Sequence, residues 1–290
     1  MTYYRHKKGG IYHILHEASH TETGEKFIIY QDVYNEKKIW ARPKEMFFEK
    51  GRFVKISKEE ALGLLISNNK YYFPNLEYTS EMQNLLDEGE EFSKSVKSMV
   101  TLLTNKGLVC ENLFDSIRND DELEHTILER IKNYKTDDNL ELIFHMIQIW
   151  GGSTGRGIYV LGNGFDWNKI KPHYQKLVSR CLDVTSIDAQ TLGVVVDAVR
   201  EFDSSVEQMG VSFITKHTRY WLYKTLGYDA LPIYDSIMAR FVMRKKSAMM
   251  LHLPEYWMVM LEKSKEYKVG LMQLERQIFK FAFHVYSKRD

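Results

Sequence analysis

A lysine and an aspartate in the last third of the chain have side chains suited to chemistry on a sugar. Lys216 falls inside an expected helix that ends at Gly227, and Asp235 follows Leu231-Pro232 at or near the start of the next helix. An unprotonated lysine amine is a nucleophile that forms Schiff bases. A carboxylate stabilises the positive charge that develops on a sugar ring when its glycosidic bond breaks. Together the two residue types are able to combine nucleophilic attack with stabilisation of a developing positive charge.

This chemistry requires a lowered pKa for the Lys216 amine. Burial or nearby cations would lower that pKa, and Arg219, one turn along the helix, and the adjacent His217 are candidates for such cations. The alternative interpretation is structural: Lys216 is then a solvated helix lysine and Asp235 an ordinary helix N-cap. The residue types alone leave both interpretations open.

The order of elements in residues 205–242 resembles that of a known family. A helix, a short turn at Gly210, a second helix with Lys216 and a third that begins near Asp235 resemble the lysine and aspartate pair of the helix-hairpin-helix DNA glycosylases. The branch similar to 8-oxoguanine DNA glycosylase is nearest in layout. The family's hairpin has a Gly-x-Gly step, whereas this chain offers Gly210 alone. The resemblance implies that Lys216 is the nucleophile and that Asp235 stabilises the charged sugar.

A glycine-rich loop lies between two expected helices at 150–157. It is not a P-loop, because no Lys-Ser or Lys-Thr pair follows the glycines. Glycines let the backbone approach a flat ligand or a phosphate closely. The resemblance implies that this loop lines a base pocket, with Trp150 stacking and Arg156 contacting phosphate or base; the alternative is a tight helix connection with Trp150 in the core. The residues that we expect to contact substrate or DNA are Trp150, Gly151, Gly152, Arg156, Gly210, His217 and Arg219.

The net charge of +1 conceals a segregation of charge along the chain. Residues 1–55 carry 11 Lys and Arg against 7 Asp and Glu, and residues 210–250 carry 7 against 2, whereas residues 76–145 carry 7 against 16. Two basic regions and an acidic one predict a face that attracts a polyanion such as double-stranded DNA. Uneven decoration of the surface is the alternative.

Length and composition are those of a globular protein with one large core or two domains. The 290 residues are 44% hydrophobic and 27% charged. Two cysteines, Cys110 and Cys181, and a start without a basic-then-apolar leader favour a reducing, cytoplasmic location. Since no apolar run reaches membrane-spanning length, no membrane partner is expected.

The first 57 residues have the alternation of a small β-domain. Turn residues separate alternating runs at 11–15, 26–30 and 38–43. Four or five short strands predict a compact, barrel-like domain. Tyr4–Gly10, Trp40–Pro43 and Phe47 together resemble a small stand-alone bacterial family of unknown function. We expect this domain to bind nucleic acid or a protein partner.

From residue 57 onward the spacing of apolar residues becomes helical. A capping box at Ser57–Glu60 begins a helical linker over 58–79, and Ser80 begins a longer helix through Leu103. Further helices are expected at about 122–134, 139–150, 167–181, 187–202 and 270–286. The predicted fold is therefore α+β, with an all-α, helix-hairpin-helix glycosylase-like domain over 80–290 after the β-domain.

One metal-binding motif is rejected on structural grounds. His16-Glu17-Ala18-Ser19-His20 matches the pattern H-E-x-x-H, which binds zinc only on a helix. The residues around it alternate as a strand, in which the two histidines would stand roughly 13 Å apart. We expect no metal and no cofactor, and without a four-cysteine cluster near the C-terminus the iron–sulfur branch of the glycosylases is excluded.

The sequence therefore predicts a bifunctional DNA glycosylase with AP-lyase activity, which flips a damaged or modified base out of the duplex and releases it through Lys216. An oxidised guanine is implied by the resemblance alone, and a hypermodified base of foreign DNA is a second candidate. Two other functions stay open. One is a non-catalytic nucleic-acid-binding protein on the same scaffold, and the other is a hydrolase in which Asp235 acts with water and Lys216 serves only as a cation.

Overall fold

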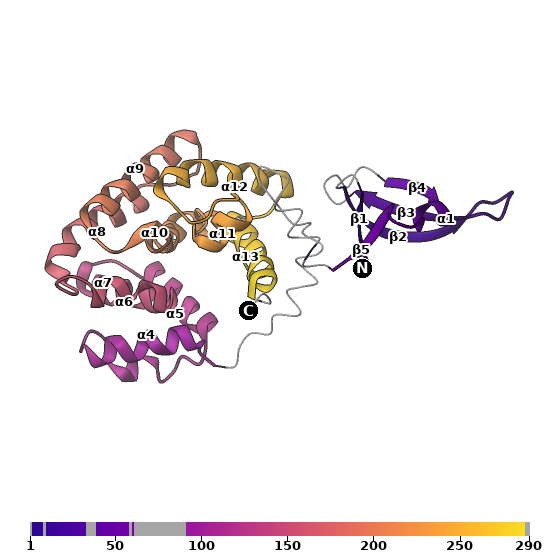
Figure 1. Cartoon of the computed structure of the whole chain (residues 1–290). Helices are drawn as coiled ribbons and strands as arrows, with labels where there is room; N and C mark the ends of the chain where they lie inside the picture. The colour runs from indigo at the N-terminus through magenta and orange to yellow at the C-terminus, as the bar shows by residue number, and fades with distance from the viewer. Residues whose placement is uncertain (1, 8–9, 33–38, 58–59, 61–90, 288–290) are drawn as a thin grey trace. The chain divides into compact units, whose positions relative to one another are not determined.

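The computed structural model describes residues 2–7, 10–32, 39–57, 60 and 91–287. The chain divides into two compact units, one of residues 1–73 with 284–290 and one of residues 74–283. The first holds an antiparallel sheet and the second is helical, so the predicted α+β class is confirmed (Figure 1). The linker predicted at 58–79, apart from residue 60, and the first part of the helix predicted from Ser80 lie outside the described residues.

The N-terminal unit contains a five-stranded antiparallel sheet with the order β4-β3-β2-β1-β5. Its strands are β1 (Tyr3–His6), β2 (Ile11–Ser19), β3 (Lys26–Asp32), β4 (Ile39–Pro43) and β5 (Phe53–Ile56). The short helix α1 (Lys44–Phe47) places Phe47 in a small core with Tyr4, Ile28 and Tyr30. Phe47 also stacks on Phe53, with 4.2 Å between ring centroids. Aromatic side chains therefore supply much of this unit's apolar contact.

The H-E-x-x-H run lies on a strand, as its alternation predicts. His16 and Glu17 belong to β2, where His16 stands opposite Ile29 of β3. Successive strand residues point to opposite faces of the sheet, so this run does not have the helical geometry that the zinc motif needs.

The five helices expected at 122–134, 139–150, 167–181, 187–202 and 270–286 are present to within three residues at each end, whereas the helices at 157–160 and 253–267 were not predicted. The α-helices that the structure describes in the second unit run in chain order from residue 94 to residue 287. They are α4 (Lys94–Asn105), α5 (Asp120–Lys132), α6 (Leu140–Trp150), α7 (Gly157–Val160), α8 (Trp167–Leu182), α9 (Ala189–Ser205), α10 (Gly210–Leu226), α11 (Ser236–Phe241), α12 (Leu253–Tyr267) and α13 (Leu271–Ser287). None of the helices in the described ranges is both long enough and apolar enough to cross a bilayer.

Helix α4 begins later than the apolar stripe predicts. Ser93 is its N-cap and accepts a hydrogen bond from Val96 N at 3.3 Å, so the helix starts at Lys94 instead of running through from Ser80. Phe92 therefore precedes the helix. The remaining stripe faces inward as expected, since Val96, Met99 and Leu103 are buried.

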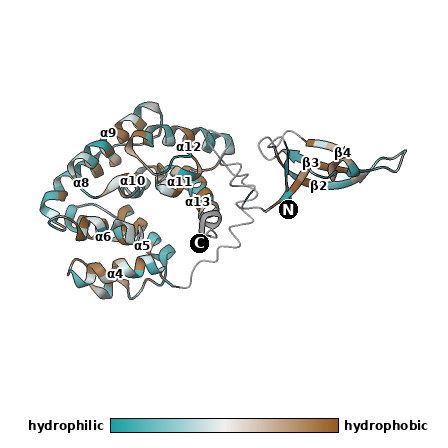
Figure 2. Ribbon diagram, viewed as in Figure 1, coloured by the Kyte–Doolittle hydropathy of each residue, from teal (hydrophilic) through white to brown (hydrophobic). Residues whose placement is uncertain are grey.

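Helix α10 lies at the centre of the helical unit (Figure 1). It contacts α5, α6, α8 and α9, and every residue from Phe213 to Leu222 is buried. Some of its buried polar atoms are hydrogen-bonded, as where Trp221 Nε1 donates to Tyr174 Oη at 2.7 Å, whereas Arg219 Nε and Tyr220 Oη have no hydrogen-bond partner among the described residues. The surrounding helices carry hydrophilic and hydrophobic residues in alternating patches, as expected for helices with one face toward a core (Figure 2). Side chains in the middle of α10 are therefore surrounded by other helices.

A four-residue hairpin, 206–209, connects α9 to α10. Gln208 has a φ of +67° and Gly210 a φ of +46°, which lets the chain reverse within this short span. With its amide oriented to suit its neighbours, the Gln208 side chain donates to the carbonyls of Gly157 (3.0 Å) and Leu161 (3.2 Å). The glycine-rich loop after α6 and the hairpin before α10 thus lie against each other.

Candidate active site

Lys216 is the buried cation on the central helix. Lys216 is only 8% exposed. Its Nζ donates a hydrogen bond to Ser212 Oγ at 3.2 Å and lies 4.3 Å from the centre of the Phe213 ring. Burial lowers the pKa of Lys216; Asp235 and Glu275 oppose that shift, and Arg219 adds to it. The solvated helix lysine of the structural alternative is therefore not what the structure contains. An amine with a lowered pKa is neutral more often near neutral pH, as a nucleophile must be.

Asp235 is the N-cap of α11, as its position after Leu231-Pro232 predicts. Its carboxylate accepts hydrogen bonds from Ile237 N at 2.9 Å and Met238 N at 2.8 Å, and the residue remains half-buried. Burial raises the pKa of Asp235, whereas Lys216 and the two backbone N–H groups lower it. The carboxylate is thus fixed in direction by the helix end while it stays partly open to solvent.

A hydrogen bond between their neighbours brings Lys216 and Asp235 together. Thr215, which precedes Lys216, accepts at Oγ1 a hydrogen bond of 3.0 Å from the backbone N–H of Tyr234, which precedes Asp235. The charge of each residue shifts the pKa of the other, yet no ion pair within 4.0 Å joins these two described residues.

The segment that leads to Asp235 is anchored from the other side by α12. Tyr256 Oη donates to the carbonyl of Ile233 at 2.8 Å, and Trp257 Nε1 donates to the carbonyl of Pro232 at 2.8 Å. Both aromatic side chains are fully buried. Because two hydrogen bonds fix the backbone immediately before it, Asp235 has little freedom to move away from α10.

The glycine-rich loop packs directly against the Lys216 helix. A Cβ atom on Gly151 would lie 3.0 Å from Cζ of Phe213 and 3.1 Å from Cδ of Lys216, and one on Gly155 would lie 2.5 Å from Cζ of Phe213. Ser95 of α4 supports the loop by accepting a hydrogen bond of 2.7 Å from Ser153 N. The glycines are needed because a larger residue would collide with the helix that carries the amine.

The other loop residues that we expected at the site lie around this contact. Gly152 is buried with a φ of +79°, and Arg156 is exposed. Trp150 is half-buried: its ring packs edge-on against Tyr220, 5.3 Å between centroids, with the Arg219 guanidinium 5.7 Å away. Arg156 borders an open surface depression of about 520 Å³, together with Ser153, Thr154, Gly157, Val160 and Leu161. One edge contact of the Trp150 ring is thus with Tyr220, and the stacking of Trp150 on a base and the contact of the exposed Arg156 with a ligand stay predictions.

His217 and Arg219 are core residues instead of surface contacts to DNA. His217 is fully buried, with Tyr174 Oη 2.7 Å from its Nδ1 and Gln148 Nε2 3.2 Å from its Nε2. Burial, then Lys216, lowers the pKa of His217 well below its usual value, so it is a neutral ring and not the cation that we considered beside Lys216. Arg219 is 4% exposed and engaged with carboxylates, which leaves it no path to a phosphate in this structure.

The hairpin residue Gly210 is exposed at the first turn of α10. The backbone N–H groups of a first helical turn have no partner within the helix, so this end of α10 favours an anion. The position agrees with the expected contact between Gly210 and a DNA phosphate, which stays a prediction.

Two buried acids beside the site were not among the predicted residues. Glu124 of α5 and Glu275 of α13 both pair with Arg219, at 2.9 Å and 3.5 Å. The sequence contained a signal for Glu275, because it interrupts the apolar stripe formed by Leu271, Leu274 and Ile278. An acid on the buried face of a helix indicates a partner or a function.

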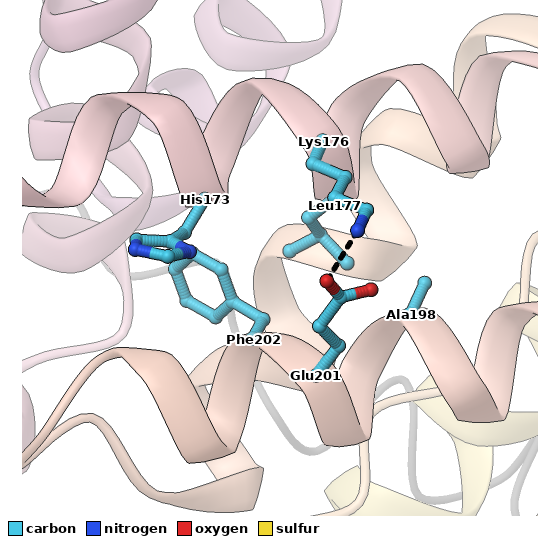
Figure 3. Close-up of a pocket in the computed structure, with 6 residues that line it drawn as sticks. All are labelled: His173, Lys176, Leu177, Ala198, Glu201 and Phe202. Carbon is cyan, nitrogen blue, oxygen red and sulfur yellow. Dashed lines mark hydrogen bonds and ion pairs between the residues drawn. The ribbon is translucent and has the colours of Figure 1, made fainter.

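A separate small cavity lies between α8 and α9, away from Lys216. Figure 3 shows its lining by His173, Lys176, Leu177, Ala198, Glu201 and Phe202, with an ion pair between Lys176 and Glu201 across it. Its volume of about 10 Å³ has space for roughly one water molecule. It is a packing defect between two helices and not a substrate site.

No group of three or more His, Cys, Asp and Glu side chains in the described ranges is arranged to hold a metal ion. Cys110 and Cys181 are both free.

Comparison with known proteins bears on the N-terminal unit. Residues 2–59 match a family described as a protein of unknown function (DUF1653). This agrees with the resemblance expected for the β-domain and places its end close to residue 57. Neither the curated proteins nor the solved structures that were compared contain a match to the chain. The family match covers the β-domain and leaves the helical unit to be interpreted from its own geometry.

Proposed function

We propose that the helical unit is a DNA glycosylase with AP-lyase activity that acts through Lys216. The observation that supports this most directly is a buried lysine, with a pKa lowered by burial, tied through one hydrogen bond between neighbouring residues to a helix-capping aspartate. A lysine without a direct carboxylate partner in a buried site is costly unless it serves a purpose. Nucleophilic attack on an N-glycosidic carbon is a purpose that both residues fit.

The proposed reaction begins with the Asp235 carboxylate facing the deoxyribose. As the bond between C1′ and the base nitrogen breaks, the base leaves with the bonding electron pair and takes up a proton, and the carboxylate stabilises the positive charge on the sugar. The neutral Lys216 amine forms a bond to C1′ and loses a proton. Opening of the sugar ring then gives a Schiff base, from which β-elimination of the 3′ phosphate cleaves the strand.

The surface around the site offers contacts for DNA. Positive groups are available on three segments: the N–H groups of the first turn of α10 at Gly210, the exposed Arg156 of the glycine-rich loop, and the exposed cations Arg240 of α11 and Lys245 and Lys246 after it. Phosphate contacts of this kind position a duplex without reading its sequence. The target base would then be flipped out of the helix toward Lys216. By resemblance the base is an oxidised guanine, and a hypermodified base of foreign DNA is the other candidate.

One observation favours a non-catalytic, nucleic-acid-binding role instead. The Lys216 residue is 8% exposed, and the Phe213 ring lies 4.3 Å from its amine, so a flipped base must displace packed side chains before it reaches the nucleophile. A protein that only binds DNA would need no such movement.

Borohydride trapping separates these functions. Duplexes with one abasic site, one 8-oxoguanine or one of several other modified bases are incubated with the full-length protein and sodium borohydride. A Schiff-base enzyme becomes covalently attached to the abasic duplex and to the duplex that carries its target base. Base release without attachment would indicate the hydrolase in which Asp235 acts with water, and binding with neither product would indicate the non-catalytic role.

A further inference from the structure

A buried charge cluster lies behind Lys216 and has no role in the reaction as described so far. Arg219 bridges two carboxylates: its Nη2 donates to Glu124 Oε1 at 2.9 Å, and its Nη1 lies 3.5 Å from Glu275 Oε2. The three residues come from α10, α5 and α13 and are almost fully buried. Arg276, at the edge of the cluster, pairs with Asp121 at 2.5 Å and lies 4.0 Å from Glu124.

Glu275 is an incompletely satisfied member of this cluster. Its residue is 4% exposed, and its Oε2 accepts no hydrogen bond, since the Arg219 contact is an ion pair without hydrogen-bond geometry. Burial raises the pKa of Glu275 to about 7; Arg219 opposes this shift, Asp235 and Glu124 add to it, and Lys216 opposes it. A buried carboxylate without a full set of donors is unstable as an anion, so its charge state changes easily.

Lys216 lies within the field of this carboxylate. Residues three apart on a helix share a face, so Lys216 lies on the same face of α10 as Arg219, which contacts Glu275 at 3.5 Å. The charged groups that act on Lys216 are Asp235 at the start of α11, Glu275 on α13 and Arg219 on its own helix. Tyr220 and Tyr256, which also face the cluster, have pKa values raised well above the usual one by burial and remain neutral. Of the two acids that act on Lys216 in the part of the chain that the structure describes, Asp235 caps a helix and Glu275 does not.

We propose that Glu275 is a positioning residue whose carboxylate, held by Arg219, sets the pH at which the Lys216 amine becomes reactive. When Glu275 is ionised, its negative charge favours the protonated ammonium of Lys216. When Glu275 is protonated, burial acts on Lys216 with less opposition, and the neutral amine is favoured. The two groups then titrate as a coupled pair, so the amine is released over a wider pH range than a single group would give. The role in catalysis depends on the proposed glycosylase function, whereas the coupling itself does not.

The coupling is measured without DNA by reductive methylation. Full-length protein is treated with formaldehyde and cyanoborohydride at a series of pH values, and the initial rate of methylation at Lys216 is read by peptide mass spectrometry. Only the neutral amine reacts. In Glu275→Gln the midpoint of this profile is expected to fall by about one pH unit, the lower end of the effect of one nearby charge. Glu275→Asp keeps the charge and should restore a midpoint near that of the wild type.

Glu124→Gln is the matched control. It removes the other carboxylate that pairs with Arg219, but Glu124 is not among the groups that act on Lys216. Its loss lowers the pKa of Glu275, which keeps Glu275 ionised, so the Lys216 midpoint should stay in place or rise. An unchanged midpoint in Glu275→Gln, or an equal fall in Glu124→Gln, would overturn the proposal.

Two further measurements keep the outcome decisive. If Glu275→Gln does not fold, as judged by circular dichroism, the wild-type profile decides: a shallow, two-step profile supports the coupling, and a single one-proton step contradicts it. Borohydride trapping on abasic DNA is run in parallel on the same samples. Methylation midpoints that shift as expected without any trapping would uphold the coupling while the proposed glycosylase function fails.

Discussion

Replacement of Gly155 by alanine tests whether the glycine-rich loop must sit directly on the Lys216 helix. The added Cβ would lie 2.5 Å from Cζ of Phe213 and 2.7 Å from Oε1 of Gln148, closer than nonbonded atoms can approach. Phe213 cannot swing aside freely, because Gly151 closes on the same ring and Lys216 lies beside it. Overpacking of a filled core costs about 1–3 kcal/mol. For a domain of this size each kcal/mol lowers the melting temperature by about 2–4 °C.

The assay is thermal unfolding followed by circular dichroism at 222 nm. Gly155→Ala should melt about 2–12 °C below the wild type. Gly193→Ala is the matched control, because Gly193 lies within α9 with nothing within 4 Å of an added Cβ. There the better helix propensity of alanine should stabilise the protein by up to about 1 kcal/mol. If Gly155→Ala melted at or above the wild-type temperature, the close packing of the loop on Phe213 would be refuted.

Two other predictions concern catalysis and DNA binding. Asp235→Asn keeps a side chain that caps helices well but removes the charge, so base release should slow by about 100-fold or more with little loss of affinity for DNA. If binding and kinetic assays showed equal losses of affinity and rate, Asp235 would be only a structural cap. Residues 1–57 carry net positive charge, so their deletion should weaken duplex binding. The slope of log affinity against log salt concentration should become shallower by about 0.9 for each DNA phosphate that this segment neutralises. Covalent trapping by Lys216 at saturating DNA should persist. An identical salt slope in fluorescence anisotropy would show that the β-domain does not touch DNA and would favour a protein partner for it.

Local signals were sufficient to predict most elements and the cap at Asp235. The Leu231-Pro232 break and the aspartate that follows it predict a helix start, and the structure places that start at Ser236 with Asp235 as its cap. The strand pattern around His16 was equally local and correct. Such signals depend on a few adjacent residues, so they can be recognised in the sequence without knowledge of tertiary packing.

The roles of residues on α10 could not be predicted in this way. This helix is buried on all sides, so no apolar stripe indicates which residue faces which neighbour. The sequence predicted both His217 and Arg219 as available cations. In the structure His217 is a neutral ring hydrogen-bonded to Tyr174, and the charge of Arg219 is balanced by acids from α5 and α13. Those partners are 43 to 95 positions away in sequence, and only the tertiary fold brings them together.

The central claim is that Lys216 is a nucleophile, and borohydride trapping on a duplex with a single abasic site tests it most directly. The wild type is compared with Lys216→Gln and with Lys169→Gln, a control that removes an exposed lysine whose side chain is 77% accessible. The account predicts a covalent protein–DNA adduct in the wild type and in Lys169→Gln, with its attachment mapped to Lys216 by mass spectrometry, and no adduct in Lys216→Gln despite retained DNA binding. Equal adduct formation by Lys216→Gln, or no adduct with the wild type on DNA that it binds, would contradict the account.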